Sequence, residues 1–177
     1  MTPHLDTTIT AARRGVAVTH ARELPSPVGP LLLTSAGGRV TGVFFGEAHA
    51  ARHGVTVARF EPDAILDRTA RALDGYFAGH VRTFDVPIAS ASGTPFQNRV
   101  WSALLEIPHG ETRSYAELAA RLGSPDSARA VGAANGKNPL SILVPCHRVI
   151  GASGALTGYA GGTEAKRWLL DHERAFE

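Results

Sequence analysis

Short apolar runs separated by polar turns predict an amino-terminal sheet. The runs at 31–34 and 40–45 are typical of strands, and the glycines at 37–38 between them indicate a hairpin turn. Apolar side chains recur at helical spacing from 65 to 77, which predicts a helix there. A further short strand is expected over 82–88. These elements predict a small α/β domain with no obvious chemistry.

Breaks in this pattern divide the chain. Residues 1–18 carry no periodicity, so we expect a loose extension there. The small and polar residues at 89–93 are typical of a linker. We therefore expect an α/β (α+β) fold, with an amino-terminal sheet-plus-helix domain over 19–90 and a mostly helical domain over 91–177.

Helix start signals are clearest in the second domain. Thr94 and Gln97 are spaced as a capping box, and Ser114 and Glu117 form a second one. Helices are expected to begin at both places, and a third is expected over 127–135. Short helices joined by a tight turn have the outline of a helix-turn-helix, which occurs in DNA-binding proteins and in many all-helical cores.

Small side chains make up most of the predicted third helix, and Arg129 is its one long cation. Small side chains let a helix backbone lie close to a partner, so both a tightly packed internal helix and a DNA contact fit this composition. A helix that reads the major groove usually carries several polar side chains, which this one lacks. If it binds DNA, we expect a minor-groove approach with Arg129 inserted.

Composition narrows the class of protein. The 177 residues are 44% hydrophobic and 19% charged, as in a globular chain, and no apolar run approaches the roughly 20 residues of a membrane helix. A single cysteine excludes an internal disulfide framework and a zinc site built from several cysteines. The first residues lack the layout of a secretory signal. We therefore expect a cytoplasmic protein.

Net charge alone does not decide the partner. A formal charge of +2 permits nucleic-acid binding without arguing for it. One stretch, 121–148, holds four basic residues against the single acid Asp126. Such a run fits a solvated face as well as a DNA contact.

The only cysteine, Cys146, follows an apolar run and Pro145, and it precedes His147 and Arg148. A lone cysteine in this position is often an inert core residue. Positive charge from its two neighbours would instead lower the thiol pKa and favour the reactive thiolate. Adjacent side chains on an extended backbone point opposite ways, so a link from thiol to imidazole needs a bend or a bridging water. A third group must then orient the imidazole.

Three segments carry a resemblance to a known family: Arg129-Ala130-Val131-Gly132, Asn138-Pro139 and Pro145-Cys146-His147-Arg148-Val149. In that order and spacing they resemble the O6-alkylguanine-DNA alkyltransferases, also called methylated-DNA–protein-cysteine methyltransferases. The likeness continues through the glycine-rich stretch 158–162 and the helix-like stretch 166–173. It spans about residues 24 to 173 in all, and the segment around the cysteine is its most specific part.

The resemblance implies direct-reversal DNA repair by a single-turnover transferase. Cys146 would take the alkyl group of O6-alkylguanine irreversibly, His147 would draw the thiol proton through a water, and Glu173 would orient His147. Tyr115 would protonate N3 of the departing guanine and help to rotate the nucleotide out, because guanine leaves poorly unless a ring nitrogen is protonated. Asn138 would brace the turn that carries the cysteine.

The resemblance also implies a surface for double-stranded DNA. Because the target atom lies inside the base stack, the nucleotide must be flipped out at a cost of a few kcal/mol. Arg129 would fill the gap left in the duplex, and Ala130 and Ala134 on the same predicted helix would contact the DNA.

A pocket for the flipped base is implied as well, lined by Val149, Tyr159 and Ala160. The backbone carbonyls of Cys146 and Val149 would accept from the exocyclic amine of the base, and the backbone N–H of Ala160 would face O6. Position 160 is Ala where some relatives carry Ser, which removes a hydroxyl and keeps the N–H.

The resemblance implies no cofactor and no metal, because the only cysteine is already assigned and the structural zinc of some relatives needs others. We expect a monomer in solution that can assemble on DNA. An alternative is a non-catalytic binder of alkyl lesions that recruits other repair factors, although relatives of that kind carry Trp in place of the cysteine. A cysteine hydrolase is a third class, and no oxyanion hole for it is evident. The preferred alkyl group and activity on O4-alkylthymine stay open.

Overall fold

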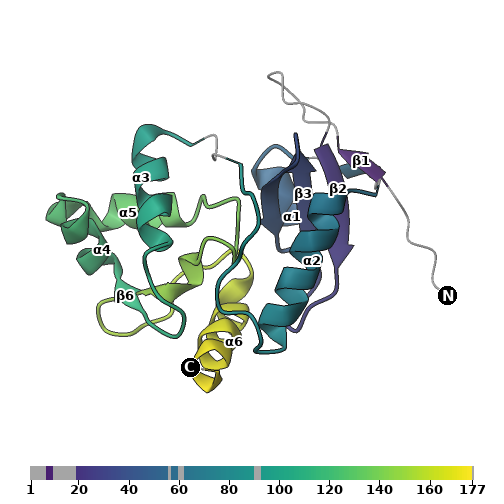
Figure 1. The fold of residues 1–177 in the computed structure, drawn as a ribbon. Coiled ribbons are helices and arrows are strands. Elements are labelled where there is room, and N and C mark those ends of the chain that lie inside the picture. Colours follow the sequence, from purple (N-terminus) through teal and green to yellow (C-terminus); the bar gives the residue numbers. More distant parts are fainter. Residues whose placement is uncertain (1–6, 10–18, 56, 60–61, 90–92, 177) are drawn as a thin grey trace. The chain divides into compact units, whose positions relative to one another are not determined.

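The computed structural model describes residues 7–9, 19–55, 57–59, 62–89 and 93–176 (Figure 1). The chain divides into two compact units, Met1–Ser90 and Ala91–Glu177. The first unit contains a sheet and two helices, and the second is mostly helical. This is the mixed α/β class that the sequence predicts.

An antiparallel sheet forms the first unit, with strands in the order β4-β3-β2-β1-β5. Its strands are β1 (Thr7–Ile9), β2 (Thr19–Leu24), β3 (Leu31–Ala36), β4 (Arg39–Phe44) and β5 (Val57–Arg59). Strands β3 and β4 form the predicted hairpin, and the turn between them uses Gly37 and Gly38 at φ 55° and 70°. Glycine suits this turn because positive φ costs it no steric strain.

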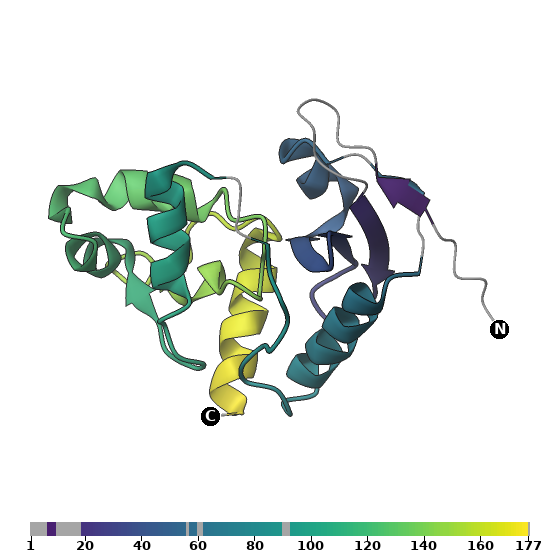
Figure 2. The same ribbon diagram turned by 45° about the horizontal axis from the view of Figure 1, so that its top comes forward.

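Two helices pack on this sheet (Figure 2). Helix α1 (Gly46–Arg52) buries Ala50 against Leu32 and Phe44, and helix α2 (Ala64–Phe77) packs on strands β2, β3 and β4. The sequence predicts α2 within one residue at its start. Asp63 caps it, because its side chain accepts from the backbone N–H groups of the first turn at 2.7 and 3.1 Å.

Several expectations for the first unit are wrong. Residues 82–88 are not a strand: Ile88 alone makes an isolated bridge, to Val40. Two backbone hydrogen bonds hold its end, from Val40 N–H to Pro87 O at 2.9 Å and from Ala89 N–H to Val40 O at 2.8 Å, and the ring of Phe84 lies 5.4 Å from that of Tyr76. Part of the expected extension is strand β1, which pairs with β2 and β5, while 1–6 and 10–18 lie outside the described residues.

The second unit contains α3 (Pro95–Leu104), β6 (Arg113–Ser114), α4 (Tyr115–Arg121), the 3-10 turn η1 (Pro125–Ser127), α5 (Ala128–Asn135), the 3-10 turn η2 (Cys146–Arg148), β7 (Val149–Ile150) and α6 (Gly162–Ala175). Both predicted capping boxes are confirmed, at Thr94 with Gln97 and at Ser114 with Glu117. Strands β6 and β7 pair in parallel, so the start of α4 lies beside the segment that follows η2.

Helices α4 and α5 pack against each other across η1 and form the expected helix-turn-helix. Helix α3 packs on α5, and the indole Nε1 of its Trp101 donates to the carbonyl of Ala134 at 2.9 Å. This bond anchors the carboxyl end of α5 in the core of the unit, close to the segment that carries Cys146.

Candidate active site around Cys146

Cys146 lies on a sharp turn rather than on an extended strand. It begins η2, its side chain forms no disulfide, and it is 4% exposed. The backbone N–H of Arg148 donates to Pro145 O at 3.0 Å, and that of Val149 donates to Cys146 O. The bend that a thiol–imidazole link requires is therefore present in the backbone.

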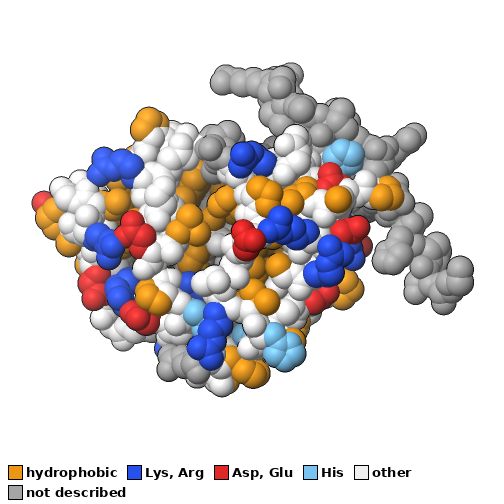
Figure 3. Space-filling model, in the orientation of Figure 1, with side chains coloured by type: hydrophobic (Ala, Val, Ile, Leu, Met, Phe, Trp, Pro, Cys, Tyr) orange, Lys and Arg blue, Asp and Glu red, His pale blue; other side chains and the backbone are white. Residues whose placement is uncertain are grey.

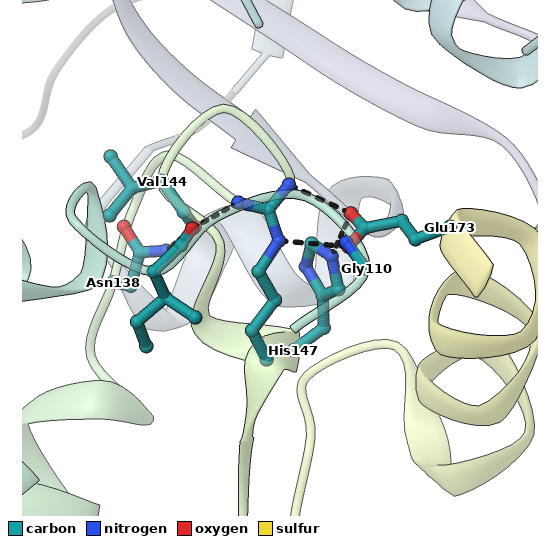
Figure 4. Close-up of polar contacts among 7 residues, drawn as sticks. Gly110, Asn138, Val144, His147 and Glu173 are labelled. Carbon is teal, nitrogen blue, oxygen red and sulfur yellow. Dashed lines mark hydrogen bonds and ion pairs between the residues drawn. The ribbon is translucent and has the colours of Figure 1, made fainter. Parts of the chain in front are cut away.

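Asn138 holds the segment before the cysteine. Its side-chain nitrogen donates to Val144 O at 2.8 Å, and its side-chain oxygen accepts from the backbone N–H of Leu140 at 3.0 Å (Figure 4). Ile142, inside this segment, has a φ of 72°, a left-handed conformation that costs an isoleucine free energy. The asparagine amide is one of the contacts that keep this strained loop in place.

The Glu173 carboxylate, on α6, collects the polar groups around the cysteine (Figure 4). One oxygen accepts from His147 Nε2 at 2.8 Å and from Arg148 Nη2 at 3.0 Å. The other accepts from Arg148 Nε at 2.9 Å and from the backbone N–H of Gly110 at 3.1 Å. Arg148 also donates to Ile107 O at 2.6 Å. His147 and Glu173 are fully buried, and Arg148 is 6% exposed.

Charge in this network is settled by competing effects. Burial raises the pKa of Glu173, but hydrogen bonds from His147 and Arg148 and the charge of Arg148 outweigh it and hold that pKa well below its usual range. Burial lowers the pKa of His147 more than Glu173 raises it, with a further lowering from Arg148 and Lys166. At neutral pH the pair is a neutral imidazole beside a carboxylate. The ring then donates through Nε2–H and keeps Nδ1 as an acceptor.

The pKa of the Cys146 thiol shifts in the direction opposite to the expectation. Burial raises its pKa, and the opposing contributions come from the Asn138 side chain, the charge of Lys166 and the backbone N–H groups of Cys146 and His147. The expectation that His147 and Arg148 lower the thiol pKa through positive charge is wrong. His147 is neutral, and Arg148 is paired with Glu173.

Lys166 is a residue of the site that the sequence reasoning missed. It is fully buried on α6, and its Nζ donates to Val149 O at 2.7 Å and to Thr157 O at 3.1 Å. Its ammonium also lies 5.9 Å from the centroid of the Tyr115 ring. A lysine in helical register with Leu169 and Leu170 is the signal that could have identified it, since it shares their apolar face.

Tyr115 is the first residue of α4 and lies close to this lysine. Thr157 Oγ1 is 3.5 Å from the Tyr115 hydroxyl, and a Cβ placed on Gly132 of α5 would lie 3.7 Å from the ring. The tyrosine therefore contacts α5, the loop before α6 and the buried lysine. The structure brings it to the same region as Cys146.

The expected DNA-contacting residues of α5 separate. Arg129 and Ala130 are exposed, whereas Ala134 is 3% exposed and its carbonyl accepts from Trp101. The assignment of Ala134 to a DNA surface is therefore wrong, because Ala134 lies on the buried face of α5, which packs on α3. Ala133, one position earlier, is exposed. The buried face fits the interpretation as a packed internal helix, and a DNA contact by the exposed face stays a prediction.

The expected pocket residues lie around the thiol turn. The Tyr159 ring meets that of His147 edge-on at 6.5 Å, and Ala160 is partly exposed at the end of the loop before α6. The two carbonyls expected to accept a base amine already have donors: Lys166 at Val149, and two N–H groups at Cys146, one from the Val149 backbone and one from Asn135. A carbonyl oxygen accepts two hydrogen bonds, so the Cys146 carbonyl has no position left for a base amine while both of its donors stay in place.

Charge on the surface is mixed. On the face drawn in Figure 3, basic and acidic side chains of the second unit are interspersed. Arg121 pairs with Glu106, and Arg113 pairs with Glu111. Within the described residues no group of three or more His, Cys, Asp or Glu side chains is placed to hold a metal ion. No described helix is long and apolar enough to cross a membrane.

One unit thus combines a buried cysteine, a histidine–glutamate pair next to it and a helix-turn-helix, which is the arrangement of a DNA-binding protein with a thiol at its site. Comparisons with known proteins identify the family. Residues 95–175 match the model of the 6-O-methylguanine DNA methyltransferase DNA-binding domain, and 21–90 match that of its ribonuclease-like domain. The chain belongs to the methylated-DNA–protein-cysteine methyltransferase family.

Named relatives and solved structures agree. The methylated-DNA–protein-cysteine methyltransferase of Mycobacterium tuberculosis is 48% identical over 157 residues, 88% of this chain and 93% of that protein. The constitutive enzyme of Bacillus subtilis is 47% identical over 152 residues, 84% and 92% of the two chains. A crystal structure of the M. tuberculosis O6-methylguanine methyltransferase covers 90% of this chain and 94% of its own, with a TM-score of 0.79 and 47% identity. The M. tuberculosis protein in complex with DNA covers 89% and 94%, with a TM-score of 0.78 and 49% identity.

Proposed function

We propose that this chain repairs DNA by direct reversal, taking the alkyl group of O6-alkylguanine onto Cys146 in a single turnover. The observation that carries the proposal is the buried Cys146 beside the His147–Glu173 pair, in a unit with a helix-turn-helix. The family supports it, because its relatives are named for transfer from methylated DNA to a protein cysteine. Double-stranded DNA is the proposed partner, with the chain a monomer in solution and its place of action the cytoplasm.

The proposed reaction is a displacement at carbon. The Cys146 thiolate attacks the alkyl carbon, a C–S bond forms, the C–O6 bond breaks, and its electron pair passes into the guanine ring. The departing guanine gains a proton, which Tyr115 is proposed to supply at N3. Because the product is a stable thioether, each chain acts once.

His147 is the proposed base for the thiol proton. Its Nε2–H donates to Glu173, and within the described part of the chain its buried Nδ1 has no hydrogen-bond partner. A neutral imidazole with a free acceptor nitrogen suits proton removal, and a bridging water is proposed to carry the proton from the thiol. Glu173 orients the ring and stabilises the imidazolium that forms.

Burial of the thiol makes this base necessary. Since burial raises the Cys146 pKa, most of the thiol keeps its proton at neutral pH until a base removes it. The charge of Lys166 favours the thiolate once it forms. The site thus protects an unreacted cysteine, and the proton path activates it.

Access to the lesion is proposed to follow base flipping. Arg129 is exposed in the first turn of α5, where it can enter the duplex and fill the position of the extruded nucleotide. Ala130 lies beside it and leaves room for close approach of the backbone. Val149, Tyr159 and Ala160 are proposed to line the pocket that receives the base.

Intact mass spectrometry after mixing with O6-methylguanine DNA tests the proposal. We expect the chain to gain one methyl group on Cys146, located by peptide mapping, and unmodified DNA to cause no gain. An unchanged mass with retained lesion binding would contradict transfer and would support the alternative, a non-catalytic lesion binder. The intact cysteine, histidine and glutamate disfavour that alternative.

A further inference from the structure

Asn135, the last residue of α5, lies against the backbone of the cysteine turn. It is 4% exposed, and its side-chain nitrogen is 3.3 Å from the Cys146 carbonyl oxygen. A carbonyl oxygen can only accept, so the amide must point its nitrogen at Cys146. Its own oxygen is buried and has no hydrogen-bond partner within the described residues.

A packing role does not account for this side chain. Leaving a buried amide oxygen unpaired destabilises the folded state, and an apolar residue of the same shape would avoid that destabilisation. The amide is therefore present for its N–H, which has one acceptor, the carbonyl of Cys146.

That carbonyl belongs to the peptide unit whose N–H is the backbone N–H of His147. A trans peptide is planar, and its C=O and N–H point in opposite directions. A donor on the carbonyl therefore sets the direction of the N–H and strengthens it as a donor. On the other side, the His147 N–H interacts with the Cys146 sulfur in the direction that stabilises the thiolate.

We propose that Asn135 is a positioning residue for alkyl transfer, which holds the Cys146–His147 peptide so that its N–H faces the sulfur. The Val149 N–H holds the same carbonyl from within η2, and Asn135 adds the one contact that comes from α5. The helix with Arg129 in its first turn thus ends in contact with the peptide of the nucleophile. The inference rests on the proposed transfer to Cys146.

Other charged groups near the Cys146 sulfur also affect its pKa and must stay unchanged in a test of Asn135. His147 and Arg148 lie on η2 itself, and Lys166 and Glu173 come from α6. Helices α3 and α5 each contain one charged side chain, and both are exposed: Arg99 and Arg129. Substituting Asn135 changes none of these charges.

Two variants remove the donor without adding a charge, Asn135→Leu and Asn135→Ala. Ser141→Ala is the matched control. Ser141 lies in the loop between α5 and η2, is 1% exposed, and its hydroxyl has no hydrogen-bond partner within the described residues. Three quantities are measured at a series of pH values: the single-turnover rate on O6-methylguanine DNA, the rate of Cys146 alkylation by iodoacetamide, and lesion affinity in a Cys146→Ser background.

For both Asn135 variants we expect transfer and iodoacetamide alkylation to slow about five- to tenfold at neutral pH. Both rates should recover as the pH is raised, because a rise of one unit in the thiol pKa lowers the thiolate fraction about tenfold. Lesion affinity should stay within twofold, and Ser141→Ala should match the wild type.

A wild-type pH profile in folded Asn135 variants would overturn the inference. So would a loss of rate, affinity and melting temperature together without a shift of the profile, which marks a purely structural role. If Asn135→Leu does not fold, Asn135→Ala and the iodoacetamide profile decide. Failure of the proposed function looks different: the wild type itself would gain no methyl group, while the iodoacetamide comparison would still report on Asn135.

Discussion

The two units treat ionisable side chains in opposite ways. In the described part of the first unit, the buried ionisable side chains are His49 and the phenol of Tyr76. The second unit buries a cysteine, two histidines, an arginine, a lysine and a glutamate: Cys146, His147, His172, Arg148, Lys166 and Glu173. Burying charge opposes folding unless each group is paired, so this set is costly and must be held by specific contacts. The buried residues of the first unit are mostly apolar, whereas those of the second unit include this network of ionisable groups.

Two buried histidines make the difference concrete. His49 accepts the backbone N–H of Phe45 at 3.1 Å and lies between aromatic rings, so it caps and packs helix α1. His147 donates to Glu173 at 2.8 Å and leaves Nδ1 free to accept. Burial lowers the pKa of both. A lowered pKa is therefore not a mark of catalysis, and neither is a ring nitrogen without a hydrogen-bond partner, which both residues have within the described part of the chain. The bonded nitrogen separates the two: a backbone N–H occupies the acceptor nitrogen of His49, whereas Glu173 takes the N–H of His147 and leaves its acceptor nitrogen free.

The largest expected effect is at the nucleophile. Cys146→Ser should abolish transfer, because a hydroxyl does not displace the alkyl group, while lesion affinity should stay within a few-fold since docking depends on the helix-turn-helix. Mass spectrometry and a binding titration measure the two quantities. If a folded variant lost affinity and transfer equally, the division between docking and chemistry would be wrong.

Next in size is the carboxylate. Glu173→Gln should slow transfer by about a hundredfold, in the range of general-base contributions, with a much smaller loss of lesion affinity. Glu164→Gln, exposed in the first turn of the same helix, is the control and should keep the wild-type rate. Single-turnover kinetics measure both. A wild-type rate in Glu173→Gln would remove its proposed role.

Arg129→Ala should slow transfer from a lesion in duplex DNA, with a rise of about 1–3 kcal/mol in the activation free energy, because the flipped nucleotide leaves an unfilled gap. Free O6-benzylguanine has no duplex to open, so its reaction should be nearly unaffected. Rates on the two substrates at two salt concentrations make the comparison. Equal losses on both would refute insertion, and a duplex loss that fades as salt rises would indicate a phosphate contact instead.

The smallest expected effect on transfer is in the first unit, where the expected change is in stability. The pKa of His49 falls from 6.5 to about 4 through burial, with further lowering by His53 and Arg52. Between those pH values the unfolded chain binds more protons than the folded chain, so the free energy of unfolding falls as pH drops. At about 1.4 kcal/mol per pKa unit, we expect this residue to lower the free energy of unfolding by about 3 kcal/mol between pH 7 and pH 4.

His49→Gln tests that assignment, because the amide oxygen keeps the acceptor for Phe45 and does not titrate. Calorimetric unfolding of the full chain at pH 7, 5.5 and 4.5 should show a weaker pH dependence in the variant than in the wild type. His53, whose pKa is also lowered by burial, contributes with the same sign and leaves a residual slope. An unchanged pH dependence would show that His49 is not the group responsible.

Local sequence signals predicted the elements whose causes are local. The capping boxes at Thr94 and Ser114 act within four residues, and the Gly37-Gly38 turn needs only its own backbone freedom. Strands β1 and β5 were missed because each is three residues long, too short for a period to be visible. Their pairing depends on a neighbouring strand rather than on their own pattern.

The amino-acid sequence by itself determined the family and the grouping of His147 and Arg148 with Cys146, the proposed nucleophile, because these are properties of residue type and spacing. Tertiary structure decided the rest of the site. The chain positions of Lys166 and Asn135 do not show that both reach the cysteine turn, and the spacing of Ala130 and Ala134 does not show that only the first is exposed. The direction in which the Cys146 pKa shifts also depends on the fold, because burial and the pairing of Arg148 with Glu173 arise only when distant segments meet.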